Sequence, residues 1–282
     1  MIEVGKNNYL KVNRKTDIGY LLEDNEGNST VLHFNDCNNI EPIIGSYIDV
    51  FVYIDSKGRP SATLHNPILK VGDEGFLKVV GSSNSGIFLN NGIIKDVYMD
   101  TKILKDLSPT NYPKIDDMIF CTLKYSTNLI ARPLYEPHTK ELKTLKLKDK
   151  VSGYIIKIDK SGLRVCTKDL NVIYIYKDYI RGEYRLGQMV EATITKEPTN
   201  QSNSYYGSLI ENKESMISTD SSLIISYLVA HDNVMPLTSD SSASEVYSLL
   251  KISNKAFKRA LGNLYKRRMV DFVDNKTILL RK

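Results

Sequence analysis

The sequence contains few of the residues that bind metals or form disulfides. Its 282 residues include three cysteines and four histidines. The cysteines are odd in number, far apart and never arranged as C-x-x-C, so we expect reduced thiols and no structural zinc site. No histidine has a partner at metal-ligand spacing. These residues are Cys37, Cys121, Cys166, His33, His65, His138 and His231. The sequence therefore predicts no metal centre.

Catalytic motifs and membrane signals are missing as well. No G-x-S-x-G motif, P-loop or G-x-G-x-x-G fingerprint occurs. His33 and Asp36 could form a dyad, but an isolated histidine in a strand is more often a binding or packing residue. We expect no catalysis and no cofactor. No apolar run approaches the ~18 residues of a membrane span, and the first residues lack an apolar signal-peptide core. With reduced thiols, this favours a cytoplasmic protein without a membrane partner.

The stretch from Val151 to Leu209 contains five short β-forming runs separated by Gly, Asn, Asp and Ser clusters. The runs are Tyr154–Ile158, Gly162–Val165, Val172–Tyr176, Met189–Ile194 and Tyr205–Leu209. Strands this short with turns this frequent favour a small barrel or sandwich. A five-stranded module of this size is the OB-fold, a Greek-key barrel that binds oligonucleotides.

The same pattern occurs twice upstream. Leu10-Lys11-Val12 and Leu77-Lys78-Val79 each follow a glycine after four residues, and each valine precedes another glycine by seven. These later glycines, Gly19 and Gly86, open a second strand, as Gly162 does in the third copy. A repeat of 67 to 76 residues is too long for a solenoid turn. It predicts three complete small domains in tandem.

After Ile210 the hydrophobic period changes from 2 toward 3.6, which predicts helices. A first helix carries Leu223 and Leu228 and ends near His231. Ser242 and Glu245 form a capping box for a second helix. A third helix is expected from residue 253 to about 269, followed by a β-hairpin over 270–280. Three helices followed by a hairpin is the order of a winged helix-turn-helix.

The expected fold is therefore mainly β with an α/β tail. It consists of three tandem five-stranded OB-fold barrels and a winged helix-turn-helix. The predicted segments are module one at 1–67, module two at 68–134, a basic linker at 135–150, module three at 151–213 and the winged helix at 214–282. The linker lysines are Lys140, Lys143, Lys146, Lys148 and Lys150. A solvated linker is the favoured interpretation, with phosphate contacts as the alternative.

Positive charge is concentrated at the C-terminal end. The whole chain has a net charge of +5, whereas residues 253–282 contain nine Lys or Arg and two acids, hence +7. The remainder of the chain is therefore −2. A basic stripe confined to one region is the usual electrostatic footprint of a nucleic-acid contact. A solvated helix face is the alternative.

The third helix of the tail has a polar stripe opposite an apolar one. Its predicted phosphate-binding residues are Lys255, Lys258, Arg259 and Lys266. Gly262 lies in the same stripe, where glycine costs a helix roughly 1 kcal/mol relative to alanine. It allows a close approach of another backbone, and two candidates remain, a phosphodiester and a neighbouring helix.

Module two resembles the S1 domain, an OB-fold RNA-binding module. The S1 signature reads Gly-Ala-Phe-Val on the second strand and Gly-Leu-Val-His-Ile-Ser on the third. This chain has Gly86-Ile87-Phe88-Leu89 and Asp96-Val97-Tyr98-Met99-Asp100. The resemblance places the ring-bearing position of strand two at Phe88 and the histidine position of strand three at Tyr98.

The corresponding positions are Arg164 and Tyr174 in module three, and Leu21 and His33 in module one. Rings and guanidinium planes suit single-stranded bases, and stacking contributes about 1–3 kcal/mol per base. Packing within the barrel is the alternative role. Leu21 cannot stack well, which favours a structural module one. The predicted RNA-binding residues are Phe88, Tyr98, Arg132, Arg164, Tyr174, Tyr206 and His33.

The whole chain resembles the CvfB family (conserved virulence factor B), bacterial RNA-binding regulators with S1-like modules and a winged helix. The most specific part is the run ISNKAFKRALGNLYK at 252–266, which is similar to the family's S-x-x-x-F-K-R-A-[IL]-G-x-L-Y-K. The resemblance implies a non-catalytic regulator that binds single-stranded RNA. Two alternatives remain, a winged-helix DNA-binding protein with OB spacers and a protein-interaction adaptor on the ribosome or RNA polymerase. The oligomeric state is not predicted.

Overall fold

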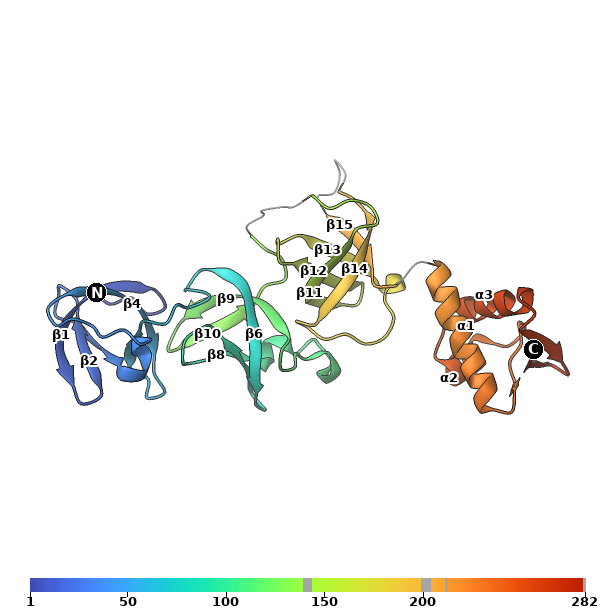
Figure 1. The fold of residues 1–282 in the computed structure, drawn as a ribbon, viewed down its shortest axis with the longest axis horizontal. Helices are drawn as coiled ribbons and strands as arrows, with labels where there is room; N and C mark the ends of the chain where they lie inside the picture. The colour runs from blue at the N-terminus through green and yellow to red at the C-terminus, as the bar shows by residue number, and fades with distance from the viewer. Residues whose placement is uncertain (139–143, 199–203, 211–212, 281–282) are drawn as a thin grey trace. The chain divides into compact units, whose positions relative to one another are not determined.

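A computed structural model describes residues 1–138, 144–198, 204–210 and 213–280. The chain forms two compact units, Met1–Leu209 and Ile210–Lys282. Figure 1 shows three small β-barrels in the first unit and a helical second unit. The predicted linker residues Lys140 and Lys143 lie outside the described residues.

Each barrel is closed by five strands in the same order. Barrel one contains β1 (Asn7–Thr16), β2 (Gly19–Glu23), β3 (Ser29–His33), β4 (Tyr47–Ile54) and β5 (Pro60–Thr63). Barrel two contains β6 (Glu74–Ser82), β7 (Gly86–Asn90), β8 (Val97–Asp100), β9 (Met118–Tyr125) and β10 (Leu129–Pro133). Barrel three contains β11 (Lys150–Asp159), β12 (Gly162–Thr167), β13 (Val172–Tyr176), β14 (Met189–Lys196) and β15 (Tyr205–Ser208). In every barrel the third and fifth strands pair in parallel, and the other pairs are antiparallel.

The repeated glycine that opens the second strand is explained by crowding against the third strand. A Cβ added at Gly19 would lie 2.1 Å from the Leu32 carbonyl oxygen, and one at Gly162 would lie 2.0 Å from that of Ile175. At Gly86 the atom in the way is in the Tyr98 ring, also at 2.1 Å. Only glycine allows the second and third strands to approach this closely at that point. The repeat read from the sequence is therefore a steric requirement of the barrel.

Apolar side chains alternate along the strands and fill three separate barrel cores. Further apolar clusters join neighbouring barrels. Phe51 and Tyr53 of barrel one pack with Leu129 of barrel two. Between barrels two and three, Arg185 donates to both carboxylate oxygens of Asp117 at 3.0 and 3.1 Å. Such a bidentate pair fixes orientation as well as distance.

The second unit has the element order predicted for a winged helix. It contains α1 (Lys213–Ala230), β16 (Val234–Met235), α2 (Ala243–Leu250), α3 (Asn254–Lys266), β17 (Val270–Val273) and β18 (Lys276–Leu279). The predicted capping box at Ser242 and Glu245 is present. The two-residue strand β16 was not predicted, because only its pairing with β18 defines it. The predicted fold class, three barrels and a winged helix, is confirmed.

All three cysteines are buried and free, and burial raises the pKa of Cys121 and Cys166 to about 12. No helix among the described residues is long and apolar enough to cross a membrane. The same residues include no group of three or more His, Cys, Asp or Glu side chains that could hold a metal ion.

Candidate nucleic-acid interface

One outward-facing line of side chains crosses each barrel over its second, third, fifth and fourth strands, in that order. We call it the cross-barrel row. Strand pairing defines its members. In barrel three they are Arg164, Tyr174, Tyr206 and Lys196. In barrel two they are Phe88, Tyr98, Ile130 and Lys124. In barrel one they are Leu21, Val31, Ser61 and Tyr53.

The row of barrel three is aromatic in its centre and basic at both ends. The Arg164 guanidinium lies 4.9 Å from the centre of the Tyr174 ring. The Tyr174 and Tyr206 ring centres are 6.0 Å apart, and Lys196 Nζ lies 5.6 Å from the centre of the Tyr206 ring. Tyr176, which is 52% exposed, stacks on Tyr206 at 5.6 Å and 13°. This surface offers ring faces to bases and cations to phosphates.

Arg164 already has an acidic neighbour. Its guanidinium lies 3.6 Å from the Glu136 carboxylate and donates to the Tyr135 carbonyl oxygen at 3.3 Å. Both partners belong to the segment that follows β10. A carboxylate therefore occupies part of the guanidinium edge that a phosphate would use.

The row of barrel two holds two rings and one cation. Phe88 and Tyr98 face each other across β7 and β8, with ring centres 5.9 Å apart at 58°. The Tyr98 hydroxyl donates to the Ser85 carbonyl oxygen at 2.7 Å, and the ring covers Gly86. Phe88 is 36% exposed. The structure thus brings together the two rings that the S1 resemblance singled out.

Barrel one lacks this character. Its row contains no cation, and its one ring, Tyr53, is buried, with its hydroxyl donating to Asp36 Oδ2 at 3.1 Å. Burial is the main cause that raises the Tyr53 pKa to about 12. The register also corrects the motif alignment, because Val31, not His33, lies opposite Leu21. His33 pairs with Gly19 and corresponds to Tyr176, which pairs with Gly162 in barrel three.

Arg132 lies beside the row of barrel two. It is exposed, two residues beyond Ile130 on β10. It lines a groove of about 940 Å³ together with Lys124 and Glu74. Glu74 accepts from the His138 backbone amide at 3.0 Å and pairs with its ring. The groove therefore contains both signs of charge.

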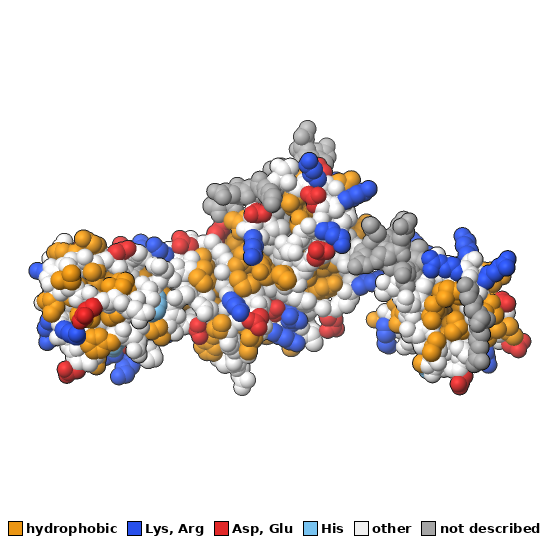
Figure 2. Space-filling view, viewed as in Figure 1, with side chains coloured by type: hydrophobic (Ala, Val, Ile, Leu, Met, Phe, Trp, Pro, Cys, Tyr) orange, Lys and Arg blue, Asp and Glu red, His pale blue; other side chains and the backbone are white. Residues whose placement is uncertain are grey.

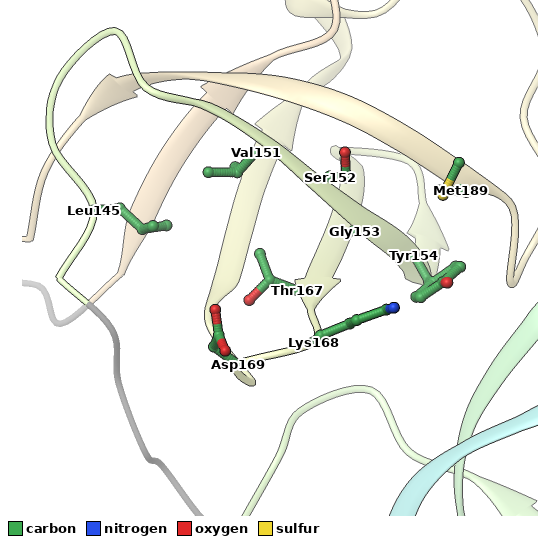
Figure 3. A pocket seen from close by; sticks show the side chains of 9 residues that line it. All are labelled: Leu145, Val151, Ser152, Gly153, Tyr154, Thr167, Lys168, Asp169 and Met189. Atoms are coloured by element: carbon green, nitrogen blue, oxygen red, sulfur yellow. The ribbon is translucent and has the colours of Figure 1, made fainter.

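A separate cavity of about 360 Å³ opens on barrel three. It is lined by Leu145, Val151, Ser152, Gly153, Tyr154, Thr167, Lys168, Asp169 and Met189. Figure 3 shows the Lys168 side chain extending toward the Tyr154 ring. No predicted site residue lines this cavity, so it is distinct from the cross-barrel row.

The basic stripe of the second unit lies on α3. Lys255, Lys258, Arg259 and Lys266 are all exposed, and within the described residues none of the four forms an ion pair. The opposite side of α3 packs into the core through Phe257, Leu261 and Leu264. Figure 2 shows Lys and Arg side chains gathered where Figure 1 draws α3.

Gly262 resolves one of the alternatives left by the sequence. A Cβ added at Gly262 would have no described atom within 4 Å, and the residue is exposed. The interpretation that it admits a neighbouring helix is therefore wrong. Open space remains over this part of the basic stripe.

Three residues of the candidate interface were not predicted from the sequence. Lys196 lies beyond the predicted strand Met189–Ile194, but the structure places it as the last residue of β14. Lys124 occupies the equivalent place on β9. It pairs with Ile130 on the fifth strand of barrel two, as Lys196 pairs with Tyr206 on the fifth strand of barrel three. Tyr176 ends β13. The available signal was the alternation of exposed and buried positions along these strands.

Comparisons with known proteins identify both kinds of domain, although the S1 match lies on barrel one and not on barrel two, whose motif carried the S1 resemblance. The profile of the CvfB-like winged helix domain matches residues 222–279, and that of an S1 domain matches residues 4–65. The chain is 28% identical to YitL of Bacillus subtilis, over 91% of this chain and 87% of that protein. It is 25% identical to Conserved virulence factor B of Staphylococcus epidermidis, over 99% and 95%, and 22% identical to that of Staphylococcus aureus, with the same coverage.

A solved structure has the same fold along the whole chain. It is described as a multidomain protein with nucleic acid binding domains from Streptococcus pneumoniae. It superimposes with a TM-score of 0.61 at 20% identity and covers 98% of both chains. The S1 domain and the winged helix are both of kinds that bind nucleic acid.

Proposed function

We propose that this chain, a CvfB-like protein with an S1 domain and a CvfB-like winged helix, is a non-catalytic RNA-binding regulator of gene expression. It would hold single-stranded RNA on the cross-barrel rows of barrels two and three. The basic stripe of α3 would add phosphate contacts. The proposal places the protein in the cytoplasm, where bacterial transcripts are translated.

The row of barrel three is the observation that supports this proposal most strongly. It combines two tyrosine rings, and the adjacent Tyr176 ring that stacks on one of them, with a cation at each end, Arg164 and Lys196. A ring can stack only on a base whose face is free, so this surface favours single strands over a duplex. Because every base has a π-face, the expected recognition tolerates different sequences.

The remaining site residues have roles in the same proposal. Phe88 and Tyr98 would stack one base on barrel two, with Lys124 or Arg132 near its phosphate. Barrel one would act mainly as a structural module, since its row has no exposed ring or cation, and His33 would be a minor contact. Lys255, Lys258, Arg259 and Lys266 would neutralise phosphates, a contribution that weakens as salt increases.

Two other functions remain to be separated by experiment. A winged-helix DNA-binding protein with barrel spacers would prefer duplex DNA, because α3 would enter a major groove. A protein-interaction adaptor would bind little naked nucleic acid. The outward-facing tyrosines of barrel three, Tyr174, Tyr176 and Tyr206, favour the single-strand function over both.

The test is fluorescence anisotropy of the full chain with single-stranded RNA, single-stranded DNA and duplex DNA over a salt series. We expect tightest binding to single-stranded RNA. A Tyr174→Ala/Tyr206→Ala variant should bind about tenfold or more weakly, given ~1–3 kcal/mol per stacked base. Tyr174→Phe/Tyr206→Phe, which keeps both rings, should bind almost as well as the unaltered chain.

Tyr9→Ala is a matched control, because Tyr9 is 70% exposed on β1 of barrel one and lies outside the rows. Thermal unfolding of every variant checks that the barrels remain folded. A preference for duplex DNA that survives the double alanine substitution would favour the winged-helix alternative. No binding to any of the three nucleic acids at low salt would reject the proposal and favour the adaptor.

A further inference from the structure

Two exposed aromatic rings of the second unit stack on each other next to the basic helix. Tyr265 lies in the last turn of α3 and Phe272 lies on β17. Their ring centres are 5.3 Å apart and the planes differ by 28°. Tyr265 is 52% exposed and Phe272 is 39% exposed. We call this pair the α3–β17 platform.

Core packing does not account for the platform. The apolar core of the unit contains Phe257, Leu261, Leu264 and Val270 but neither ring of the platform. Large exposed apolar surface is unfavourable in water, and a grouped patch of it often marks a binding site. The sequence motif that supports the CvfB resemblance includes Tyr265, yet the phosphate contacts proposed for α3 give that residue no role.

The surroundings of the platform favour an anionic ligand. Lys266, Arg267 and Arg268 follow Tyr265 directly and are exposed. Two acidic side chains are close in sequence: Asp271, whose carboxylate accepts from the Phe272 amide at 2.9 Å, and Asp274, which is exposed. Cations therefore predominate around two exposed ring faces, which is the combination found in sites for single-stranded nucleic acid.

Gly262 provides space beside the platform. It lies three residues before Tyr265, so both are neighbours on the surface of α3. The volume that a side chain would fill there is open. A sugar or phosphodiester can therefore approach the helix backbone next to the Tyr265 ring.

We infer that the α3–β17 platform is a nucleobase-stacking site, so that the winged helix binds unpaired bases of the RNA strand through Tyr265 and Phe272. The inference rests on the proposed function and extends it, since the proposed function assigns only phosphate contacts to α3. It also differs from duplex recognition, in which the N-terminal part of the recognition helix reads base edges in a groove. Tyr265 lies at the opposite end of α3.

The absence of tryptophan from the sequence allows a direct test in the full chain. A Tyr265→Trp substitution introduces one tryptophan at the platform, and stacking of a base on it should quench its fluorescence. We expect saturable quenching by oligouridine RNA of about 12 nucleotides, with the same midpoint as the anisotropy titration. Duplex DNA of equal length should quench it little.

Tyr247→Trp is the matched control. Tyr247 lies on α2, is 60% exposed and has Lys251 over its ring, 5.5 Å from the centre. It is therefore a similarly exposed tyrosine beside a cation on a different helix, and its tryptophan should not be quenched. Phe272→Ala should weaken RNA binding by about three- to tenfold, since it removes one of the two stacked rings.

Tyr206→Trp on barrel three separates this inference from the proposed function. Quenching at Tyr206→Trp without quenching at Tyr265→Trp would overturn the inference and leave the proposed function intact. Equal quenching of Tyr265→Trp by duplex DNA and by RNA would also overturn it. So would the absence of any quenching at Tyr265→Trp together with normal RNA binding by Phe272→Ala. The absence of quenching at both Tyr206→Trp and Tyr265→Trp would reject the proposed function together with the inference.

Photocrosslinking provides a measurement on the unaltered chain, independent of how the variants fold. An RNA containing 4-thiouridine should crosslink to the tryptic peptide that contains Tyr265 or to the one that contains Phe272. Crosslinks confined to the barrels would contradict the inference. A platform that instead binds a protein partner would give neither crosslinks nor quenching by RNA.

Discussion

The Arg164 guanidinium lies 4.9 Å from the centre of the Tyr174 ring, with the Glu136 carboxylate 3.6 Å away on its edge. The most basic position of the barrel-three row is therefore partly neutralised by the segment that follows β10. The affinity of the row for RNA should therefore depend on Glu136, because its carboxylate competes for the N–H donors that a phosphate needs.

Replacement of Glu136 should strengthen RNA binding. In Glu136→Gln the guanidinium keeps its place over Tyr174 but loses a charged competitor. We expect about two- to threefold tighter binding at low salt, a modest effect because the Glu136 side chain is half exposed. Glu183→Gln, at an exposed acid of the same barrel, is the charge-matched control. Equal gains in the two variants would mean that only net charge matters.

Removal of Lys196 should change the salt dependence of binding. Lys196 ends the barrel-three row, and each phosphate contact contributes about 0.7 to the slope of log K against log salt for single strands. Lys196→Ala should therefore lower the slope by about 0.7, and so should Lys124→Ala at the equivalent place on barrel two. Anisotropy titrations at several salt concentrations measure both slopes. An unchanged slope in either variant would remove that lysine from the interface.

Gly262→Ala should separate stability from binding. The substitution adds a methyl group in open space and removes a helix-interior glycine, so the free energy of unfolding of the second unit should increase by up to ~1 kcal/mol. RNA binding should weaken, because the methyl group fills the space proposed for the RNA backbone. Urea unfolding and anisotropy give the two values. A more stable variant with unaltered affinity would leave Gly262 without a binding role.

Gly162→Ala should destabilise its barrel, in contrast to the stabilising Gly262→Ala. Its added Cβ would lie 2.0 Å from the Ile175 carbonyl oxygen, which the backbone can relieve only by separating β12 from β13. We expect a loss of at least ~1 kcal/mol, in line with other strained glycine sites. A stable Gly162→Ala barrel would contradict the steric account of the repeated glycines.

Acid should destabilise barrel three through Asp159. A hydrogen bond from Ser161 is the main cause that lowers the Asp159 pKa to about 2, below its ordinary value of 3.8. Because the folded state depresses the pKa, this stabilisation is complete above about pH 4 and disappears as pH falls toward 2. The difference in melting temperature between the unaltered chain and Asp159→Asn should therefore shrink over that range. A difference that is independent of pH would mean that the carboxylate charge contributes nothing.

Several features could be predicted from the sequence because they depend on local chemistry. The glycines that open the second strands repeat because the third strand leaves no room for a Cβ, through its backbone at Gly19 and Gly162 and through the Tyr98 ring at Gly86. The helices of the tail were predicted from their apolar period, and the start of α2 from a capping box that involves residues three apart. Interactions of this kind lie within a few residues of each other in the sequence.

The candidate site depended on contacts that no local pattern encodes. The parallel pairing of the third and fifth strands places Tyr206 beside Tyr174 across more than thirty residues of sequence, and β16 exists only through its pairing with β18. The same closure pairs Lys196, which lies beyond the predicted strand Met189–Ile194, with Tyr206 at the end of the row. The stacking of Tyr265 on Phe272 requires β17 to fold back against α3.

The sequence by itself determined that this chain forms three similar β modules and a basic winged helix, because strand alternation, turn glycines and helix caps are short-range requirements of the backbone. The tertiary structure decided which rings and cations share a surface. It buried Tyr53, offset His33 from the motif position, and set Glu136 against Arg164. Barrel closure and module packing, which join residues far apart in the chain, are the physical reason for that division.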